Sequence, residues 1–393
     1  TIAVIRFLFC IIKKSPLPLK ENNKTLKTIP MKSLHRYLFL ILIINLSCFM
    51  ISCKNSKKQN TIGYGKMPKA DTIPVSQDSL YKISYNEILG MIEEKSPVSF
   101  KRAVFLLEWA YLNGKPDYQK FCTEITKHAD NLKRFIRQKG IGQYRTAGNY
   151  ALFEFFTKPN WMNGNKPYTY DFEDFTGRED YTKIFITKLM QTHTGQCRSL
   201  PIFYKILADE IGSEAYLAQA PNHLYIKHPG EDNRWVNIEL TNGHFASDPY
   251  IISSMNISAE AIRNKIYMDA MSEKQNIAFL LYELGNGYEN LYGYTPFVLQ
   301  CYNKSLQYYP HNLPALMEKH NALRTIGLEY IKKNGEKTDE FLRANHKEFK
   351  VTQKKIEALG YREMTEQQYS KWLNDMEAEK NKQRTQNNTD SKL

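Results

Sequence analysis

Three side chains that together could perform nucleophilic catalysis occur in order along the sequence: Cys197, His223 and Glu239. A cysteine attacks a carbonyl carbon as a thiolate, so its pKa must be lowered, and a helix start beside a histidine lowers it. Cys197 begins an apolar helical run, His223 opens a strand-like run, and Glu239 lies in the next one. A carboxylate there could accept a hydrogen bond from the imidazole and fix its tautomer. We therefore expect a Cys-His-acid site for acyl transfer.

The elements that would position these residues follow from hydrophobic periodicity and turn residues. Residues 197–211, CRSLPIFYKILADEI, are expected to form a helix with Pro201 in its first turn and Gly212 as its C-cap. Three strand-like runs follow, AYLAQA, HLYIKH and WVNIEL, with the turn PGEDNR before the last. The predicted order is therefore one helix and then three strands.

At these residues the chain resembles the transglutaminase-like superfamily of papain-type folds. GQCRSLP is similar to the family's nucleophile segment, APNH to its histidine segment and WVNIE to its acid segment, in the family's order. The family commonly has Asp at the acid position, so Glu239 departs from the pattern. The stretch Tyr168–Ile251 also looks like an exported group from Bacteroides-type bacteria. The resemblance implies an α+β fold, with a papain-like or transglutaminase-like core of a helix followed by an antiparallel sheet, flanked by helical regions.

The resemblance also implies an oxyanion site made by the backbone N–H of the cysteine and one side-chain donor. Gln191, six residues before the nucleophile, has the papain-like offset for that donor, and Gln196 and Trp161 compete for the role. Asp248, in FASDPY, is the alternative orienting acid to Glu239. We expect no cofactor. Because water is the default competitor for the thioester, we expect hydrolysis of a peptide or protein amide rather than transamidation.

Two other interpretations of these residues remain open. His193, His228 and His244 could bind zinc together with Cys197, but no pair has the tight spacing typical of metal ligands, so we expect no metal site. Alternatively, the chain is a non-catalytic binding or scaffold lipoprotein with a degenerate site, which recruits a protein partner through its C-terminal helices. Labelling by a thiol-directed electrophile near neutral pH would discriminate the scaffold from a cysteine-dependent amide hydrolase or acyltransferase.

The N-terminal part predicts export. From Met31 the sequence reads MKSLHRYLFLILIINLSCFMISC, in which a short basic segment precedes an apolar stretch at 37–46 that is too short for a comfortable membrane span. A small residue then precedes Cys53, as in a lipoprotein signal whose cysteine is acylated and becomes the mature N-terminus. A secretory peptide cut elsewhere and an uncut anchor are the alternatives. We expect a start at Met31 and a lipid-anchored protein of the cell envelope, with the outer membrane favoured.

The formal net charge of +13 does not indicate nucleic-acid binding. The residues before Cys53 contain eight Lys/Arg and one acid, a net +7, which leaves +6 for the remainder. No compact basic stripe interleaved with aromatic residues occurs in that remainder. The expected partners are therefore a peptide or protein substrate and a membrane reached through the lipid anchor.

Residues 276–310 resemble one tetratricopeptide repeat, with Leu281, Leu284 and Tyr288 in its first helix and Tyr302 in its second. A single repeat cannot bury its own apolar face, so we expect these four residues to be buried against the catalytic part or the helices after Pro314. The chain is thus divided into six segments. They are an upstream segment with the signal (1–52), a flexible tether (53–80), an N-terminal helical region (81–145), a transglutaminase-like domain (146–268), a tetratricopeptide-like helical region (269–376) and a disordered tail (377–393).

Overall fold

The computed structural model describes residues 76–174, 177, 179–335, 339–361 and 365–390. The described chain is mixed helix and sheet, 64% helical with a few strands. The expected signal segment and Cys53 lie outside the described residues. The tether was expected to extend to residue 80, but α3 (Gln77–Ile92) already begins at Gln77, with Ser76 as its N-cap. The hydroxyl of Ser76 accepts a hydrogen bond from Ser79 N, which is a favourable way to begin a helix.

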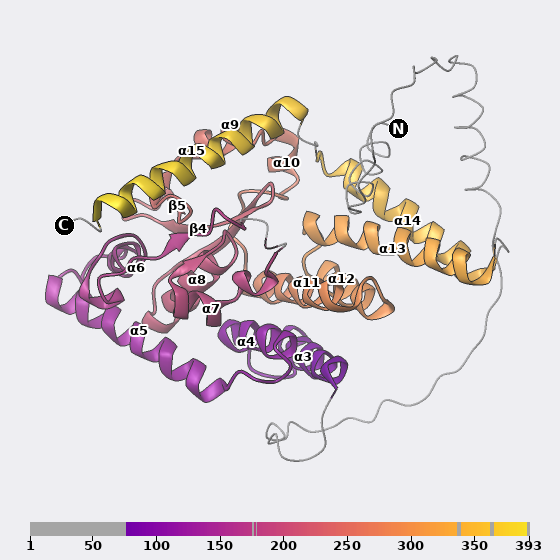
Figure 1. Ribbon diagram of the computed structural model, residues 1–393, viewed down its shortest axis with the longest axis horizontal. Helices are drawn as coiled ribbons and strands as arrows, with labels where there is room; N and C mark the ends of the chain where they lie inside the picture. The colour runs from indigo at the N-terminus through magenta and orange to yellow at the C-terminus, as the bar shows by residue number, and fades with distance from the viewer. Residues whose placement is uncertain (1–75, 175–176, 178, 336–338, 362–364, 391–393) are drawn as a thin grey trace, which may run out of the picture.

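A four-stranded antiparallel sheet occupies the centre of the described chain, with its strands in sequence order (Figure 1). The strands are β3 (Tyr216–Ala220), β4 (His223–Pro229), β5 (Trp235–Glu239) and β6 (His244–Ala246). The helix expected before them is α8 (Ser199–Ile211), which ends at a left-handed Gly212. The predicted order of one helix and three strands is therefore present, and β6 extends the sheet.

The two faces of this sheet are buried against different helices. Leu224 and Ile226 of β4 belong to the main core, together with the apolar residues of α8. Ala218 and Tyr225 point to the other face and join a second core with residues of α9 (Asp248–Ser254) and α10 (Ala259–Arg263). The alternation of side chains along a strand explains this division.

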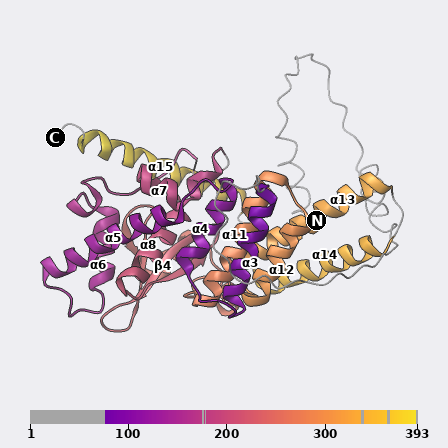
Figure 2. The ribbon, with the colours of Figure 1, turned by 90° about the horizontal axis from the view of Figure 1, so that it is seen from below.

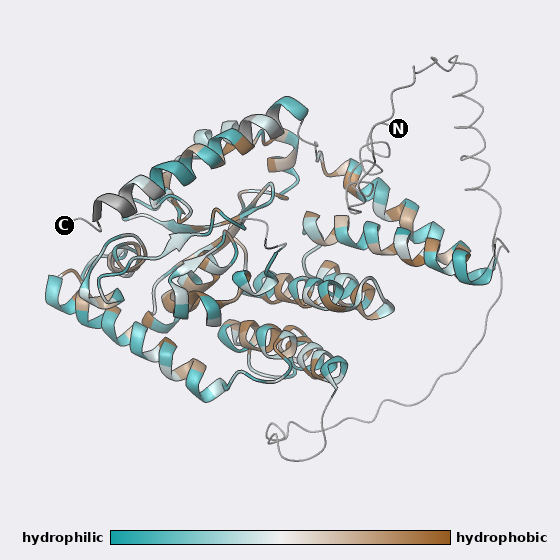
Figure 3. Cartoon of the chain, viewed as in Figure 1, coloured by the Kyte–Doolittle hydropathy of each residue, from teal (hydrophilic) through white to brown (hydrophobic). Residues whose placement is uncertain are grey.

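Helices α5 (Tyr118–Lys139) and α6 (Ala147–Thr157) contact each other and α8. A short parallel pair, β1 (Thr169–Tyr170) and β2 (Thr194–Gly195), lies beside the start of α8, and α7 (Ile186–Thr192) leads into it. In Figure 3 hydrophobic residues gather on the sides where these helices face one another, whereas α5 is hydrophilic along most of its length. The turn that contains Cys197, between β2 and α8, therefore lies among packed helices and strands.

Six other helices form hairpins that lie side by side (Figures 1 and 2). Within the described residues the pairs are α3 with α4 (Phe100–Tyr111), α11 (Glu273–Tyr292) with α12 (Pro296–Tyr308), and α13 (Leu313–Asn334) with α14 (Glu340–Ala358). Helix α11 contacts both α3 and α4, and α12 contacts α13. The first hairpin therefore packs with the C-terminal helices, although α5 to α10 separate them in sequence.

Burial of the repeat-like residues is confirmed: Leu281, Leu284, Tyr288 and Tyr302 are all buried. Their surroundings differ from the expectation, because α11 packs on the N-terminal helices as well as on α12. For example, the Tyr288 ring meets that of Tyr81 edge to face, with ring centroids 5.1 Å apart. Periodicity predicts which face of a helix is buried but not which distant element covers it.

The prediction of a disordered tail from residue 377 is wrong up to residue 390. Residues of that segment belong to α15 (Glu366–Asp390), which lies alongside the sheet region in Figure 1. Met376 packs against the main core, and Lys380 Nζ lies 2.9 Å from a Glu173 carboxylate oxygen. Residues 377–383 are mostly Glu, Ala, Lys and Gln, which have high helix propensity. Among the described residues, no helix has both the length and the apolarity needed to cross a membrane.

Candidate active site

Cys197 lies in the turn that leads into α8, two residues before the first helical residue, Ser199. The Ser199 hydroxyl accepts a hydrogen bond from Gln196 N at 2.9 Å, which holds this turn against the helix start. Gly195 permits the close approach, because a Cβ there would lie 2.6 Å from Ser199 Oγ and 2.7 Å from the Leu189 side chain. A larger residue at this position would therefore displace the Ser199 hydroxyl and the Leu189 side chain.

His223 is the first residue of β4, and Glu239 is the last residue of β5. The register pairs Ile226 with Ile238, which places Glu239 opposite Tyr225 and diagonal to His223 on the same face. Diagonal neighbours have Cα atoms roughly 7–8 Å apart, a span that a long side chain can bridge. Glu239 bridges it: His223 Nε2 donates to Glu239 Oε2 at 2.5 Å.

The second carboxylate oxygen of Glu239 is held by Thr241. Both the backbone N–H and the hydroxyl of Thr241 donate to Oε1, at 2.9 and 2.5 Å. Burial alone would raise the pKa of Glu239, but the charge of His223 and these hydrogen bonds lower it below its ordinary value. The acid is therefore ionised and fixed in orientation, as the orienting member of a triad must be.

The Cys197 thiol lies at the start of the histidine strand. Its Sγ is 3.9 Å from the carbonyl oxygen of Asn222, and it hydrogen-bonds to the His223 ring. Because Nε2 of that ring binds Glu239, Nδ1 is the nitrogen that remains for the thiol. Burial raises the pKa of Cys197, but the hydrogen bond and charge of His223 outweigh it, so the pKa lies below its ordinary value.

The pKa of His223 is raised to about 10. Burial would lower it, but the charge of Glu239 and the hydrogen bonds to Cys197 and Glu239 favour the imidazolium. These directions favour a thiolate-imidazolium pair oriented by a carboxylate, with His223 and Glu239 side chains only 13% and 14% exposed. Such a pair is an activated nucleophile for acyl transfer.

The structure also places Tyr170 at this site, although the sequence analysis did not single it out. Tyr170 is buried, and its phenol hydrogen-bonds to Cys197. Burial, the charges of Cys197 and Glu239 and this hydrogen bond raise the pKa of Tyr170 well above its ordinary value. In the sequence Tyr170 is one of many aromatic residues between 150 and 182, so no local pattern distinguishes it.

The expected side-chain oxyanion donors do not gather at the thiol. Gln191 lies exposed in α7. Trp161 is 40% exposed, and its ring packs against the Arg134 guanidinium at 3.9 Å. Gln196 is buried, but its amide donates to the backbone oxygen of Asp174. A papain-like offset in sequence does not preserve the direction of a side chain when α7 turns it outward.

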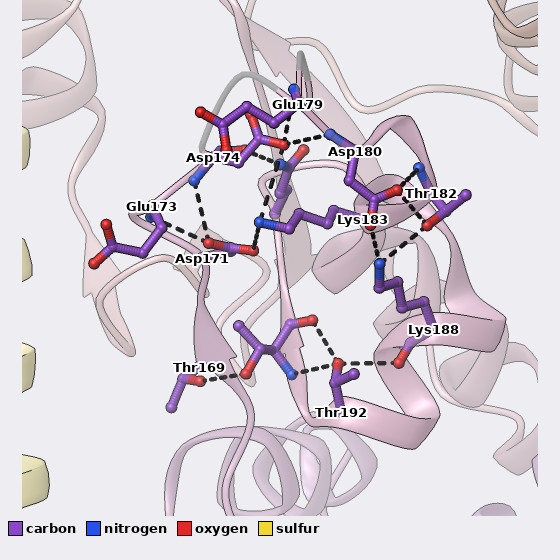
Figure 4. Close-up of polar contacts among 12 residues, drawn as sticks. Thr169, Asp171, Glu173, Asp174, Glu179, Asp180, Thr182, Lys183, Lys188 and Thr192 are labelled. Atoms are coloured by element: carbon purple, nitrogen blue, oxygen red, sulfur yellow. Dashed lines mark hydrogen bonds and ion pairs between the residues drawn. The ribbon is translucent and has the colours of Figure 1, made fainter.

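Charged residues hydrogen-bond within the loop after β1, whose Asp174 backbone oxygen accepts the hydrogen bond from Gln196 (Figure 4). A carboxylate oxygen of Asp174 accepts a hydrogen bond from Asp180 N at 2.9 Å, and Lys183 Nζ lies 2.9 Å from a carboxylate oxygen of Asp171. These contacts join both ends of the loop that follows β1. They support the backbone oxygen that holds Gln196, the residue before the nucleophile.

Asp248, the alternative acid, has a different partner. It is the exposed first residue of α9, and its Oδ1 accepts a hydrogen bond from Asn237 Nδ2 at 2.7 Å. Asn237 also donates to the backbone oxygen of Ala246, so this contact joins β5, β6 and α9. The imidazole of His223 therefore hydrogen-bonds to Glu239, whereas Asp248 hydrogen-bonds to Asn237.

The histidines considered as zinc ligands lie in separate environments. His193 stacks on Tyr168 with ring centroids 4.4 Å apart, and His228 is buried with its Nδ1 3.0 Å from the oxygen of Pro229. His244 packs near Tyr250, with ring centroids 6.0 Å apart. In the described part of the chain, no group of three His, Cys, Asp or Glu side chains could hold a metal ion.

A small pocket of about 160 Å³ lies beside the thiol. Apolar residues of α8 and the sheet form most of its wall, and Cys197, Glu239 and Thr241 complete it. The apolar members are Leu200, Pro201, Leu224, Tyr225 and Leu240. The surrounding side chains leave little free space in this pocket, so this side of the thiol is shielded from water.

Arg198, next to the nucleophile, connects the site to the helical hairpins. Its Nη1 lies 3.1 Å from Glu283 Oε2 on α11, and Glu283 is buried. The positive charge of Arg198 is a further cause of the lowered pKa of Cys197. An ion pair therefore joins helix α11 to the turn that contains Cys197.

No family model, curated protein or solved structure matches the chain. The resemblance to the transglutaminase-like superfamily therefore depends on the three sequence segments alone.

Proposed function

We propose that this protein is a cysteine-dependent acyl-transfer enzyme of the transglutaminase-like type, acting on peptide or protein amides. The observation that carries the proposal is the hydrogen-bonded chain from the Cys197 thiol through the His223 ring to Glu239, with a 2.5 Å contact at its acid end. A cysteine buried only for packing does not need a lowered pKa, an oriented histidine or a fixed carboxylate. All three together are what a thiol nucleophile requires.

The first half of the reaction forms a thioester. The Cys197 thiolate attacks the carbonyl carbon of the amide, and the C=O π electron pair moves to the oxygen. The tetrahedral intermediate collapses as the C–N bond breaks, and the leaving amine takes the proton from the His223 imidazolium. Glu239 stabilises the imidazolium until then and keeps the ring in place for the proton transfer.

The second half releases the acyl group. Water attacks the thioester carbonyl while the neutral His223 ring takes one proton from it. Collapse then breaks the C–S bond, regenerating the Cys197 thiolate and the imidazolium and releasing a carboxylic acid. A primary amine in place of water would give transamidation, but we favour hydrolysis because water is the default competitor for the thioester.

We further propose that the enzyme works in the cell envelope as a lipoprotein anchored through Cys53, with the outer membrane favoured. The basic, apolar and small residues before Cys53 support this proposal. Expression of the full chain and of Cys53→Ser, followed by mass spectrometry of the mature N-terminus, tests it. A diacylated or triacylated Cys53 is expected only in the unsubstituted chain, and an unmodified terminus beyond residue 53 would contradict the anchor.

The activity is tested by incubating the full chain and Cys197→Ala with a protein digest in the presence of a biotinylated primary amine. New carboxyl groups that depend on Cys197, detected by mass spectrometry in 18O-labelled water, indicate hydrolysis. Incorporated biotin indicates transamidation. If neither product depends on Cys197, the proposed activity is wrong.

One observation favours a non-catalytic scaffold as the second candidate. Three helical hairpins within the described residues lie side by side, as in repeat proteins that bind partners. The two candidates differ in the behaviour of the thiol: a scaffold does not need Cys197 to react with electrophiles at neutral pH, whereas the enzyme does.

A further inference from the structure

Strand pairing brings Tyr170 to the nucleophile. The parallel pair β1–β2 aligns Tyr170 with Gly195, two residues before Cys197. The neighbouring Asp171 N donates to Gly195 O at 2.7 Å, which secures this register. The position of Tyr170 is therefore set by backbone hydrogen bonds rather than by a mobile loop.

The Tyr170 side chain is held in one orientation. It is only 5% exposed, and its ring packs edge to face against Phe172 with centroids 4.8 Å apart. The phenol lies near the Cys197 sulfur, because the charge of Cys197 and hydrogen bonding to it are among the causes that raise the pKa of Tyr170. Two nearby tyrosines differ in this respect, because the buried hydroxyls of Tyr168 and Tyr225 have no hydrogen-bond partner in the described chain.

The site also needs a donor of this kind. When a thiolate attacks a carbonyl, negative charge moves from sulfur to the adjacent oxygen, and preorganised donors there stabilise the transition state. The backbone N–H of Cys197, just before α8, donates to no described residue and can supply one donor. Neither expected glutamine can supply the second donor, because Gln191 is exposed and the Gln196 amide donates to the backbone oxygen of Asp174.

We propose that Tyr170 is a catalytic residue whose phenol O–H donates to the Cys197 thiolate in the resting enzyme and to the substrate oxygen during acylation. The inference rests on the proposed acyl-transfer function and adds a residue to it. The phenol stays protonated throughout the working pH range, because its surroundings disfavour the phenolate. It therefore acts as a donor and never as a competing base.

The resting contact is tested without any substrate. The absorbance of the thiolate is measured against pH, and the same titration of a Cys197→Ala background is subtracted. Tyr170→Phe removes one donor to the thiolate, so the midpoint should move upward by about one pH unit. Tyr168→Phe is the matched control, because it removes a buried hydroxyl without a partner, and its midpoint should not move. Equal midpoints for both variants overturn the resting contact.

The role in acylation is tested by comparing two reagents at a pH where the thiol of every variant is ionised. A nitrophenyl ester reacts through an oxyanion, whereas iodoacetamide alkylates sulfur without one. Tyr170→Phe should slow acylation by about 100-fold and alkylation by less than about fivefold, and Tyr168→Phe should change neither. Equal changes in the two rates overturn the oxyanion role. If the unsubstituted protein reacts with neither reagent, the proposed function fails, while the titration still decides the contact.

Discussion

Cys197, His223 and Glu239 form one hydrogen-bonded chain, so the protonation of each depends on the other two. The pKa of Cys197 and that of Glu239 are lowered, and that of His223 is raised to about 10. The thiolate-imidazolium form is therefore favoured between the lowered pKa of the thiol and the raised pKa of the imidazole.

The rate at which iodoacetamide alkylates Cys197 should follow this window. We expect the rate to rise as the pH increases through the lowered thiol pKa and then to stay level until His223 loses its proton near pH 10. His223→Ala removes the cation, so the rise should move to higher pH. Peptide mass spectrometry measures the adduct, and buried Cys301, whose pKa is raised, should remain unmodified. An unchanged profile in His223→Ala would contradict the ion pair.

Substitution of the two candidate acids should separate their roles. Glu239→Gln removes the charge that holds the imidazolium, so we expect thiol-dependent activity to fall by about 100-fold or more without unfolding. Asp248→Asn keeps an acceptor for Asn237 and should leave activity within about threefold. Turnover and thermal unfolding of both variants are measured together. The reverse ranking would assign the orienting role to Asp248.

At the scale of elements, the position of Cys197 depends on the turn that connects β2 to α8. The two strands β1 and β2 contain few residues, yet they fix the turn that carries Cys197 and deliver Tyr170 to the same place. The close approach of β2 to α8 leaves no space for a side chain at Gly195. Small elements therefore determine the geometry of the thiol.

Gly195→Ala should disturb this entry. The added Cβ would lie 2.6 Å from Ser199 Oγ, so this hydroxyl must move away from its hydrogen bond with Gln196 N, and we expect a loss of stability of about 1–3 kcal/mol together with slower alkylation of Cys197. Gly142→Ala is the matched control, because its Cβ would meet nothing closer than 3.9 Å. Chemical denaturation and alkylation rates are compared. Equal behaviour of the two variants would show that the approach is not required.

At the scale of the whole molecule, the hairpin α3–α4 packs on α11, although α5 to α10 separate them in sequence. The buried Glu283 of α11 then pairs with Arg198 beside the nucleophile. The helical hairpins and the site are thus parts of one packed structure. A displacement of α11 is therefore expected to move Arg198 and so to alter the pKa of Cys197.

Removal of the cation should test that connection. Arg198→Met leaves the carboxylate of Glu283 buried without its partner, so we expect a loss of roughly 3 kcal/mol of unfolding free energy. Adding Glu283→Gln removes the buried charge and should restore part of the loss. Urea denaturation of both variants measures this difference. If the double variant is no more stable than Arg198→Met, the buried charge is not the cause.

Local patterns in the sequence were sufficient for much of this structure. The helix after Cys197 and the strands that begin at His223 and end at Glu239 were predictable, because side-chain periodicity and glycine or proline positions act within a few residues. The burial of Leu281 and Tyr302 was predictable for the same reason. The pairing of His223 with Glu239 rather than Asp248 was expected from the resemblance to the transglutaminase-like superfamily, in which the acid lies on the strand after the histidine.

Tertiary structure alone decided the contacts between distant segments. The parallel register of β1 and β2 brings Tyr170 to the thiol, whereas α7 turns Gln191 into solvent, and neither outcome is visible in sequence spacing. The packing of α3 and α4 on α11 likewise crosses nearly two hundred residues. The physical reason is that apolar faces and hydrogen-bonding edges are not specific for one partner by themselves. Which partner covers them depends on the simultaneous packing of all the elements.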